Sequence, residues 1–274
     1  MTTSALQDII ALLGCPAAGN PAQYLFERAI EAAELDWRFV TCDVAEPDCA
    51  AAIAGIRALG FRGCLLSGRL RAAALPHLAS VSPSAAFAGS ISLIERRPDG
   101  LAGHMTDGRG IVEALRAHVD PAGRAVLIAG ADACGRAAAL EFALAGAGAI
   151  VVADPDAAAA AGLVEALNAV HGTQAQAIEW AAPLAVPDHV TMVSIAPLAA
   201  VRFAPETLRP ELVVADATLA GRLSAAATQA AERGCCVVDG IEIHAAQTAI
   251  DFQSLSGIEP DAELLREALE EFLS

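Results

Sequence analysis

The chain has 274 residues, of which 55% are hydrophobic, and a formal net charge of −16. This apolar share excludes a disordered protein, and the negative charge makes nucleic acid and anionic membrane surfaces unfavourable partners. No apolar run is long enough to span a membrane, and the first residues, MTTSALQDII, lack the pattern of a secretory signal. We therefore expect a cytoplasmic protein.

The first part of the chain alternates between strand-like and helical segments. Short apolar runs at 9–14, 37–44 and 63–67 are separated by helical stretches at 21–34 and 46–58. This alternation favours a parallel α/β sheet. A further helix is predicted at 69–79. The sequences FAGSISLIERR and GLAGHM then flank the turn PDG, which predicts a hairpin.

A helix starting at Asp107 leads into a second alternating block, with strands predicted at 124–130, 149–154, 190–196, 211–218 and 235–240. Helices lie between most of these strands, as in a doubly wound nucleotide-binding domain. Two final helices, at about 243–254 and 261–273, have no strand to follow and are expected to pack on the first domain. We predict a two-domain α/β protein: an N-terminal substrate-binding domain at 1–106, a Rossmann-type domain at 107–240 and returning C-terminal helices at 241–274.

The segment VLIAGADACGRAA is typical of a strand that turns through a phosphate-binding loop into a helix. Gly130 and Gly135 occupy the first and third positions of the G-x-G-x-x-G pattern, whereas Asp132 occupies the second. Asp154 ends the next strand, where an acid would bind an adenosine ribose, and this favours NAD over NADP. A carboxylate at Asp132 would crowd and repel a pyrophosphate, and Arg136 could offset only the charge. The alternative is a turn capped by Asp132 that binds no ligand.

Three further segments carry a resemblance to a known family. The segments are FRGCLLSGRLR, GSISL followed by HMTDG, and GIEIHAAQTAIDFQSLSG. Their order and spacing are similar to those of motifs in the shikimate and quinate dehydrogenases. Ser67 and Arg71 stand at the family's threonine and catalytic lysine, and Ser92 stands at one of its asparagines. Asp107 and Gln247 match the family's aspartate and glutamine.

Other positions depart from the family pattern. The S-x-S-P segment that holds the ligand carboxylate in the family corresponds to GCPAAGNPAQY, with Ala18 and Asn20 ahead of a proline. The N-R-T segment that grips the phosphate of NADP corresponds to Asp-Pro-Asp at 154–156, and Leu219 replaces a family tyrosine. These departures indicate a divergent member of the family.

The resemblance implies an oxidoreductase that transfers a hydride between NAD or NADP and a secondary alcohol or ketone of a small cyclic or polyhydroxy acid. Arg71 and Asp107 would bind and polarise the reacting hydroxyl. Asp107 would act as the base, since a guanidinium is a poor proton acceptor. Ser67, Ser92 and Gln247 would bind the substrate.

Histidines offer a further proton acceptor. His244 lies three residues before Gln247 on one helical face, where it would also bind the substrate, and His104 lies three residues before Asp107. The alternative for each histidine is a packing or solvent-facing role, and Asp107 could equally be a helix cap. No pair of histidines has metal-ligand spacing, and the seven cysteines include no C-x-x-C pair, so we expect no metal site.

The sequence is compatible with two hypotheses about the function of the protein. The first is an active oxidoreductase, and the second is a catalytically silent protein that binds a metabolite and has lost its cofactor. Arg69 and Arg71 form a small positive patch in an acidic protein, so the expected ligand is a small anionic metabolite. An exposed sheet edge in the first domain could pair two copies into a homodimer.

Overall fold

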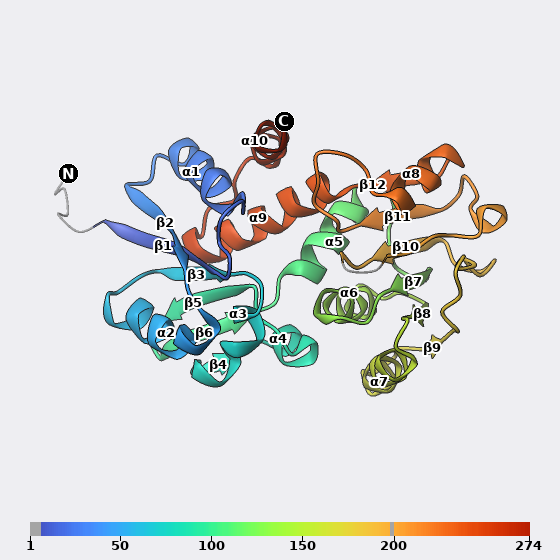
Figure 1. Ribbon diagram of the computed structural model, residues 1–274, viewed down its shortest axis with the longest axis horizontal. Coiled ribbons are helices and arrows are strands. Elements are labelled where there is room, and N and C mark those ends of the chain that lie inside the picture. The colour runs from blue at the N-terminus through green and yellow to red at the C-terminus, as the bar shows by residue number, and fades with distance from the viewer. Residues whose placement is uncertain (1–6, 198–199) are drawn as a thin grey trace. The chain divides into compact units, whose positions relative to one another are not determined.

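The computed structural model describes residues 7–197 and 200–274, which form two compact units (Figure 1). The first unit comprises the described residues up to Thr106 together with Thr248–Phe272 and Ser274. The second comprises Asp107–Gln247 and Leu273. Residues 241–247, which the sequence-based division places with the C-terminal helices, group with the second unit.

The first unit is built on a mixed six-stranded sheet in the order β2-β1-β3-β5-β6-β4. Its strands are β1 (Asp8–Gly14), β2 (Trp37–Asp43), β3 (Gly63–Leu66), β4 (Ser80–Val81), β5 (Leu93–Arg97) and β6 (Gly100–His104). The first three are parallel, as predicted, and β5 runs antiparallel to both β3 and β6. The β5–β6 pair is the predicted hairpin. Because β2 is an edge strand, pairing of two copies there stays a prediction.

The first helix packs on this sheet through one apolar stripe. In α1 (Ala22–Ala32) the buried residues Leu25, Phe26, Ala29 and Ile30 share one helical face. The Phe26 ring packs against Phe39 of β2 at 5.2 Å between centroids and against Phe252 at 5.8 Å. Phe252 belongs to the second half of a C-terminal helix, so the end of the chain does pack on the first unit. The remaining helices of this unit are α2 (Cys49–Ala58), α3 (Leu70–Ala73), α4 (Pro83–Ala88), α10 (Ala262–Leu273) and the part of α9 (Gly240–Ser256) that follows Gln247.

The second unit has a fully parallel sheet in the order β12-β11-β10-β7-β8-β9. Its strands are β7 (Ala125–Ala129), β8 (Ala149–Ala153), β9 (Ala175–Ala177), β10 (Met192–Ile195), β11 (Val213–Asp216) and β12 (Cys236–Val238). Its helices are α5 (Asp107–Arg116), α6 (Ala133–Leu144), α7 (Ala157–Asn168) and α8 (Ala225–Glu232). Along the chain, this sheet begins with β7, adds β8 and β9 on one side, and then adds β10, β11 and β12 on the other side. This is the doubly wound order predicted from the sequence, and ligands bind such sheets where the direction reverses, here between β7 and β10.

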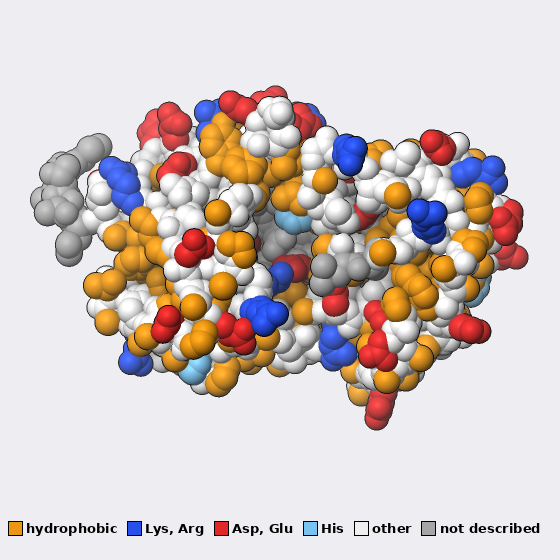
Figure 2. All heavy atoms as spheres, in the orientation of Figure 1, with side chains coloured by type: hydrophobic (Ala, Val, Ile, Leu, Met, Phe, Trp, Pro, Cys, Tyr) orange, Lys and Arg blue, Asp and Glu red, His pale blue; other side chains and the backbone are white. Residues whose placement is uncertain are grey.

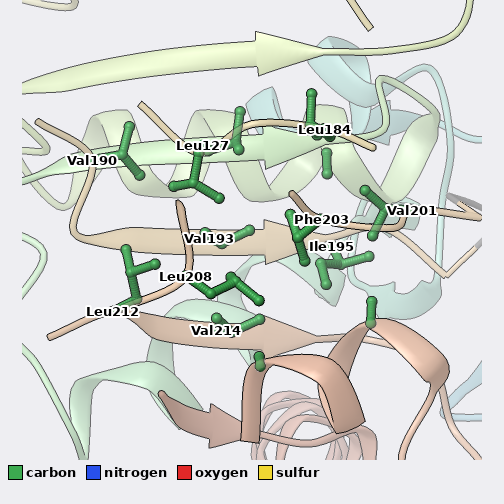
Figure 3. Close-up of a cluster of buried hydrophobic side chains, with 14 of the residues drawn as sticks. Leu127, Leu184, Val190, Val193, Ile195, Val201, Phe203, Leu208, Leu212 and Val214 are labelled. Carbon is green, nitrogen blue, oxygen red and sulfur yellow. The ribbon is translucent and has the colours of Figure 1, made fainter. Parts of the chain in front are cut away.

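The core of the second unit explains why its strands read as continuous apolar runs. Val193 of β10 lies in register with Leu127 of β7 on one side and Val214 of β11 on the other. Their side chains form part of one buried cluster together with Phe203 (Figure 3). Strands of a parallel sheet are buried on both faces, so they need apolar residues at successive positions.

Some predicted elements differ from the structure. The helix predicted at 69–79 is wrong: α3 ends at Ala73, and a separate 3-10 turn covers Leu75–His77. Pro76 has no N–H group with which to continue the α-helical hydrogen-bond ladder. Helix α9 begins at Gly240, before the predicted start, because the Asp239 carboxylate accepts hydrogen bonds from the backbone N–H groups of the first turn. In the part of the chain that the structure describes, no helix combines the length and apolarity needed to cross a membrane.

Candidate functional site

The loop between β7 and α6 keeps two glycines for steric reasons. Gly130 has a φ of +106°, a conformation that residues with a side chain rarely adopt. A Cβ on Gly135 would lie 1.9 Å from the Gly130 carbonyl oxygen, so only glycine lets α6 approach the end of β7 this closely. These are the turn and the close helix–strand contact that the first and third glycines provide in a dinucleotide-binding loop.

Asp132 caps helix α6. Its backbone is extended, and its Oδ1 accepts a hydrogen bond of 2.9 Å from the Gly135 N–H. The capping role that the sequence left open is therefore present. It also puts a carboxylate at the helix end where a pyrophosphate would bind. Arg136 lies one turn further along α6, where its backbone N–H donates to the Asp132 carbonyl oxygen.

Asp154 links the end of β8 to the same loop. One carboxylate oxygen accepts a hydrogen bond of 2.6 Å from the Ala131 N–H, and the other accepts one of 2.8 Å from the Asp156 N–H. Asp156 in turn caps α7. Two carboxylates therefore follow β8, where an adenosine ribose would lie in a Rossmann-type domain. The two glycines and Asp154 suit a nicotinamide dinucleotide, whereas the Asp132 carboxylate would repel its pyrophosphate.

Asp107 and Gln247 come together in the second unit. Asp107 is the first residue of α5 and is 8% exposed, and its Oδ1 accepts a hydrogen bond of 2.8 Å from the Gln247 Nε2. The two helices approach closely at Gly110, where an added Cβ would lie 2.7 Å from the Cβ of Gln247. The contact joins residues far apart in the sequence, and it orients a buried carboxylate with a neutral amide.

The two histidines considered from the sequence have different surroundings. His244 Nδ1 lies 2.8 Å from the Gly240 carbonyl oxygen. Because a carbonyl only accepts, Nδ1 carries the proton, and in the neutral ring Nε2 is the proton acceptor. His104 Nε2 lies 3.1 Å from a carboxylate oxygen of Glu95, on the neighbouring strand of the hairpin. This pairing favours a structural role for His104.

In the first unit, the Arg71 guanidinium contacts a backbone carbonyl group and a methionine sulfur. Its Nε donates to the Ile91 carbonyl oxygen at 3.3 Å, and its Nη2 lies 3.1 Å from Met105 Sδ. Arg69, its partner in the expected positive patch, lies 3.8 Å from a carboxylate oxygen of Glu46. All 17 residues counted as Lys or Arg are arginines. On the face drawn in Figure 2, the arginine side chains that can be seen are scattered among acidic ones. A lysine ammonium is therefore absent from the chemistry of this protein.

The two serines of the first unit differ in their hydrogen bonding. Ser92 is buried, and its Oγ accepts from the Thr106 N–H and shares a further hydrogen bond with Thr106 Oγ1, each at 2.8 Å. Ser67 Oγ is buried and has no hydrogen-bond partner among the described residues. A buried hydroxyl without a partner costs about 1–3 kcal/mol, and a ligand that reached the Ser67 hydroxyl would remove this cost.

The loop after β1 offers little to a carboxylate ligand. The Ala17 N–H donates to Asp43 Oδ1 at 2.6 Å. Asn20 Oδ1 accepts a hydrogen bond of 2.9 Å from the Ala22 N–H, at the start of α1. The one polar side chain in the sequence AAGN is thus engaged in shaping the helix start.

An acid at the end of β11 was not among the site residues predicted from the sequence. Asp216 is 2% exposed, and its carboxylate accepts hydrogen bonds from the Thr218 N–H and the Ser224 hydroxyl. It lines a cavity of about 180 Å³ that is also bordered by Arg222 and Asp239. Its position at the carboxyl end of a parallel strand was the available signal, because ligands bind at this end of such sheets. Among the described residues, no group of three or more His, Cys, Asp or Glu is arranged to hold a metal ion.

Comparison with known proteins identifies relatives, although no protein-family model matches the chain. The chain is 30% identical over 271 residues to shikimate dehydrogenase (NADP⁺) of Thermococcus kodakarensis, and the alignment covers 97% of each chain. It is 34% identical over 179 residues to shikimate dehydrogenase (NADP⁺) of Geobacter metallireducens, where the alignment covers 64% of this chain and 63% of that enzyme's length.

Solved structures agree with these relatives. The ligand-free 5-ketofructose reductase of Gluconobacter sp. strain CHM43 superposes with a TM-score of 0.92 at 29% identity, over 98% of this chain and 99% of that chain. Shikimate 5-dehydrogenase of Thermus thermophilus, in complex with NADP(H) and shikimate, gives a TM-score of 0.83 at 26% identity, over 97% of this chain and 100% of that chain. The chain therefore belongs to the shikimate dehydrogenase family.

Proposed function

We propose that the protein is a nicotinamide-dependent oxidoreductase that interconverts a secondary alcohol and a ketone on a small polyhydroxylated molecule. Membership of the shikimate dehydrogenase family supports this activity. The observation that carries it is the hydrogen bond that Gln247 donates to Asp107, which orients a buried carboxylate. Such a carboxylate can accept and return a proton, as alcohol oxidation and ketone reduction require.

The roles of the remaining residues follow from their chemistry. Gly130, Gly135 and Asp154 would hold the dinucleotide, with Asp132 and Arg136 beside its pyrophosphate. The hydride would be carried by the nicotinamide ring of the bound cofactor. Asp107 would take the proton of the reacting hydroxyl and return it in the reverse direction. His244 Nε2 would be an alternative acceptor near Gln247 on α9.

In the first unit, Arg71 would donate hydrogen bonds to the reacting oxygen and polarise a ketone, because its guanidinium stays charged at all relevant pH values. The Ser67 and Ser92 hydroxyls would bind hydroxyl groups of the substrate. These assignments suit a molecule with several hydroxyl groups, whether cyclic or open-chain.

Two substrate classes require separate assays. The relatives named shikimate dehydrogenase favour a cyclic polyhydroxy acid. The similarity to 5-ketofructose reductase, together with the lack of a serine in the AAGN loop after β1, favours an uncharged polyhydroxy ketone. Arg71 could orient either one.

We further propose that NAD is preferred over NADP. Asp154 and Asp156 both carry carboxylates after β8, and a phosphate on the adenosine ribose would be repelled by them. Several relatives carry NADP⁺ in their names, so the preference would distinguish this chain from them.

Calorimetric titration of the purified protein with NAD and with NADP tests the cofactor directly. Binding of NAD with weaker binding of NADP supports the proposal. Turnover is then measured by nicotinamide absorbance with shikimate, quinate and 5-ketofructose. Asp107→Asn is expected to lower kcat by roughly 10²–10⁴ while leaving cofactor affinity unchanged. Asp99→Asn, in the exposed turn of the hairpin, is the matched control. If neither nucleotide binds to folded protein, the silent metabolite-binding alternative replaces this function.

A further inference from the structure

Three side chains outside the proposed reaction form a chain of contacts in the second unit. Cys236 is the first residue of β12, and its Sγ lies 3.5 Å from His118 Nδ1. His118 follows the end of α5, and its Nε2 lies 2.8 Å from Glu242 Oε1 in the first turn of α9. A thiol, an imidazole and a carboxylate thus meet from three separate elements.

The carboxylate fixes which imidazole nitrogen can bind another group. Glu242, when ionised, only accepts hydrogen bonds, so His118 Nε2 carries the proton. In the neutral ring, the lone pair is then on Nδ1 and faces the Cys236 sulfur. Histidines that bind metals are commonly held in this way, with a carboxylate on the nitrogen away from the metal.

The distance between sulfur and nitrogen matches a tetrahedral metal site. Zinc binds cysteine sulfur at about 2.3 Å and histidine nitrogen at about 2.0–2.1 Å, so two such ligands at a tetrahedral angle lie about 3.5 Å apart. The thiol and the imidazole are 3.5 Å apart in this structure, where they form a hydrogen bond, and this separation is close to the tetrahedral value. An ion that replaces the proton of this hydrogen bond could contact both atoms with little change in their separation.

The cluster is accessible from solvent. The side chains of His118 and Glu242 are 33% and 32% exposed, and Cys236 is half-buried. The neighbouring Cys235 does not join the cluster, since its Sγ donates to the Arg209 carbonyl oxygen at 3.3 Å. The formal charge of −16 favours the approach of a divalent cation.

We propose that His118 and Cys236 bind Zn²⁺ or a divalent cation of similar softness, with Glu242 orienting the imidazole. The Cys236 thiol loses its proton to solvent as the sulfur–metal bond forms, and water completes the coordination sphere. Two protein ligands make this an exchangeable site, unlike the closed four-ligand sites of structural zinc. None of these three residues belongs to the proposed dehydrogenase site.

Cobalt(II) titration tests the proposal, because a thiolate bound to cobalt gives a charge-transfer band in the near ultraviolet and tetrahedral coordination gives visible bands. We expect both with the unmodified protein, and we expect ZnCl₂ to remove them by displacing cobalt. Cys236→Ser should abolish the charge-transfer band. Cys15→Ser is the matched control, because Cys15 is an exposed thiol outside the cluster. Glu242→Gln should weaken zinc binding by about 10–100-fold in competition with a chromophoric indicator.

Three results of the cobalt titration would contradict the proposed metal site. The proposal is wrong if cobalt gives no band at millimolar concentration, if the charge-transfer band persists in Cys236→Ser, or if Cys15→Ser removes it. Circular dichroism shows whether each variant is folded. Should Cys236→Ser unfold, His118→Gln takes its place, with loss of the tetrahedral bands as the expected result and their retention as the contrary one.

Discussion

Gln247 donates a hydrogen bond of 2.8 Å to the Asp107 carboxylate, and the same two helices are joined a second time by His118 and Glu242. The first contact lies at the start of α5, and the second lies just beyond its end. Helices α5 and α9 are thereby aligned along the length of α5. The proposed proton acceptor owes its orientation to this pairing, which can be tested by changes in the helix contact itself.

Gly110→Ala is expected to destabilise the protein by roughly 1–3 kcal/mol, because the added Cβ would lie 2.7 Å from the Gln247 Cβ and force the helices apart. Displacement of Gln247 should also lower kcat. Urea unfolding measures the first effect, and steady-state kinetics measures the second. Gly55→Ala in α2 is the matched control: its Cβ would meet no atom within 4 Å, so it should stabilise the protein by about 0.4–1 kcal/mol. Equal effects of the two substitutions would contradict the close helix contact.

Asp132→Gly should strengthen NAD binding, because it removes the carboxylate from the helix end and restores room for the pyrophosphate. The lost cap should cost only a few tenths of a kcal/mol, since glycine is itself tolerated at this position. Asp132→Ser keeps a capping oxygen without the charge, so it separates repulsion from crowding. Calorimetry with NAD measures both variants, and an unchanged or weaker affinity in both would show that Asp132 does not oppose the cofactor.

Glu141 in α6 provides a test that depends on pH. Burial raises the pKa of its carboxyl above the ordinary value of 4.5, and this exceeds the lowering effect of Arg109 and Arg116. Folding therefore favours the neutral carboxyl, whose stabilising contribution is present below the ordinary pKa and is lost as the pH rises through the folded-state pKa.

Glu141→Gln should thus raise the free energy of unfolding near neutral pH and have little effect at pH values below the ordinary pKa. Urea unfolding at several pH values measures the difference. Glu165→Gln, an exposed position on α7, is the control and should show no such trend. A stabilisation that is the same at every pH would point to packing instead of ionisation.

The cysteines should differ sharply in reactivity. Cys64 of β3 has no exposed surface, and burial raises the pKa of its thiol far above the usual range. Cys15 is exposed. Because the thiolate is the reactive form, an aromatic disulfide reagent should modify Cys15 in the native protein and Cys64 only after unfolding. Mass spectrometry of modified peptides gives the order, and early modification of Cys64 would mean that β3 opens readily.

The sequence predicts most of this fold because the relevant signals are local. The apolar runs at Leu127 and Val193 are long enough to identify buried parallel strands, and Gly130 and Gly135 mark a turn and a close approach that no other residue allows. The short strands β4 and β9 escaped prediction. They have few residues, largely exposed, and their pairing depends on neighbouring strands instead of their own pattern.

The geometry of the candidate site could not be predicted from the sequence, because it depends on contacts between residues that are far apart in the chain. Motif similarity brought Asp107 and Gln247 to attention, but their hydrogen bond depends on the crossing of two helices at Gly110. The cluster of His118, Cys236 and Glu242 has no sequence signature, because its members come from a helix end, an edge strand and a helix start. Spacing rules for metal ligands apply to residues close in sequence and do not find such a set.

The path of the chain through the two units also has a consequence for synthesis on the ribosome. The core of the first unit includes Phe252 of α9, which packs against Phe26 of α1. The whole of residues 107–247 is synthesised between these two aromatic residues. The inserted unit can therefore complete its own core while the unit that precedes it still awaits its final helices. A nascent chain spends this interval with part of its first hydrophobic core uncovered, when protection by chaperones matters most.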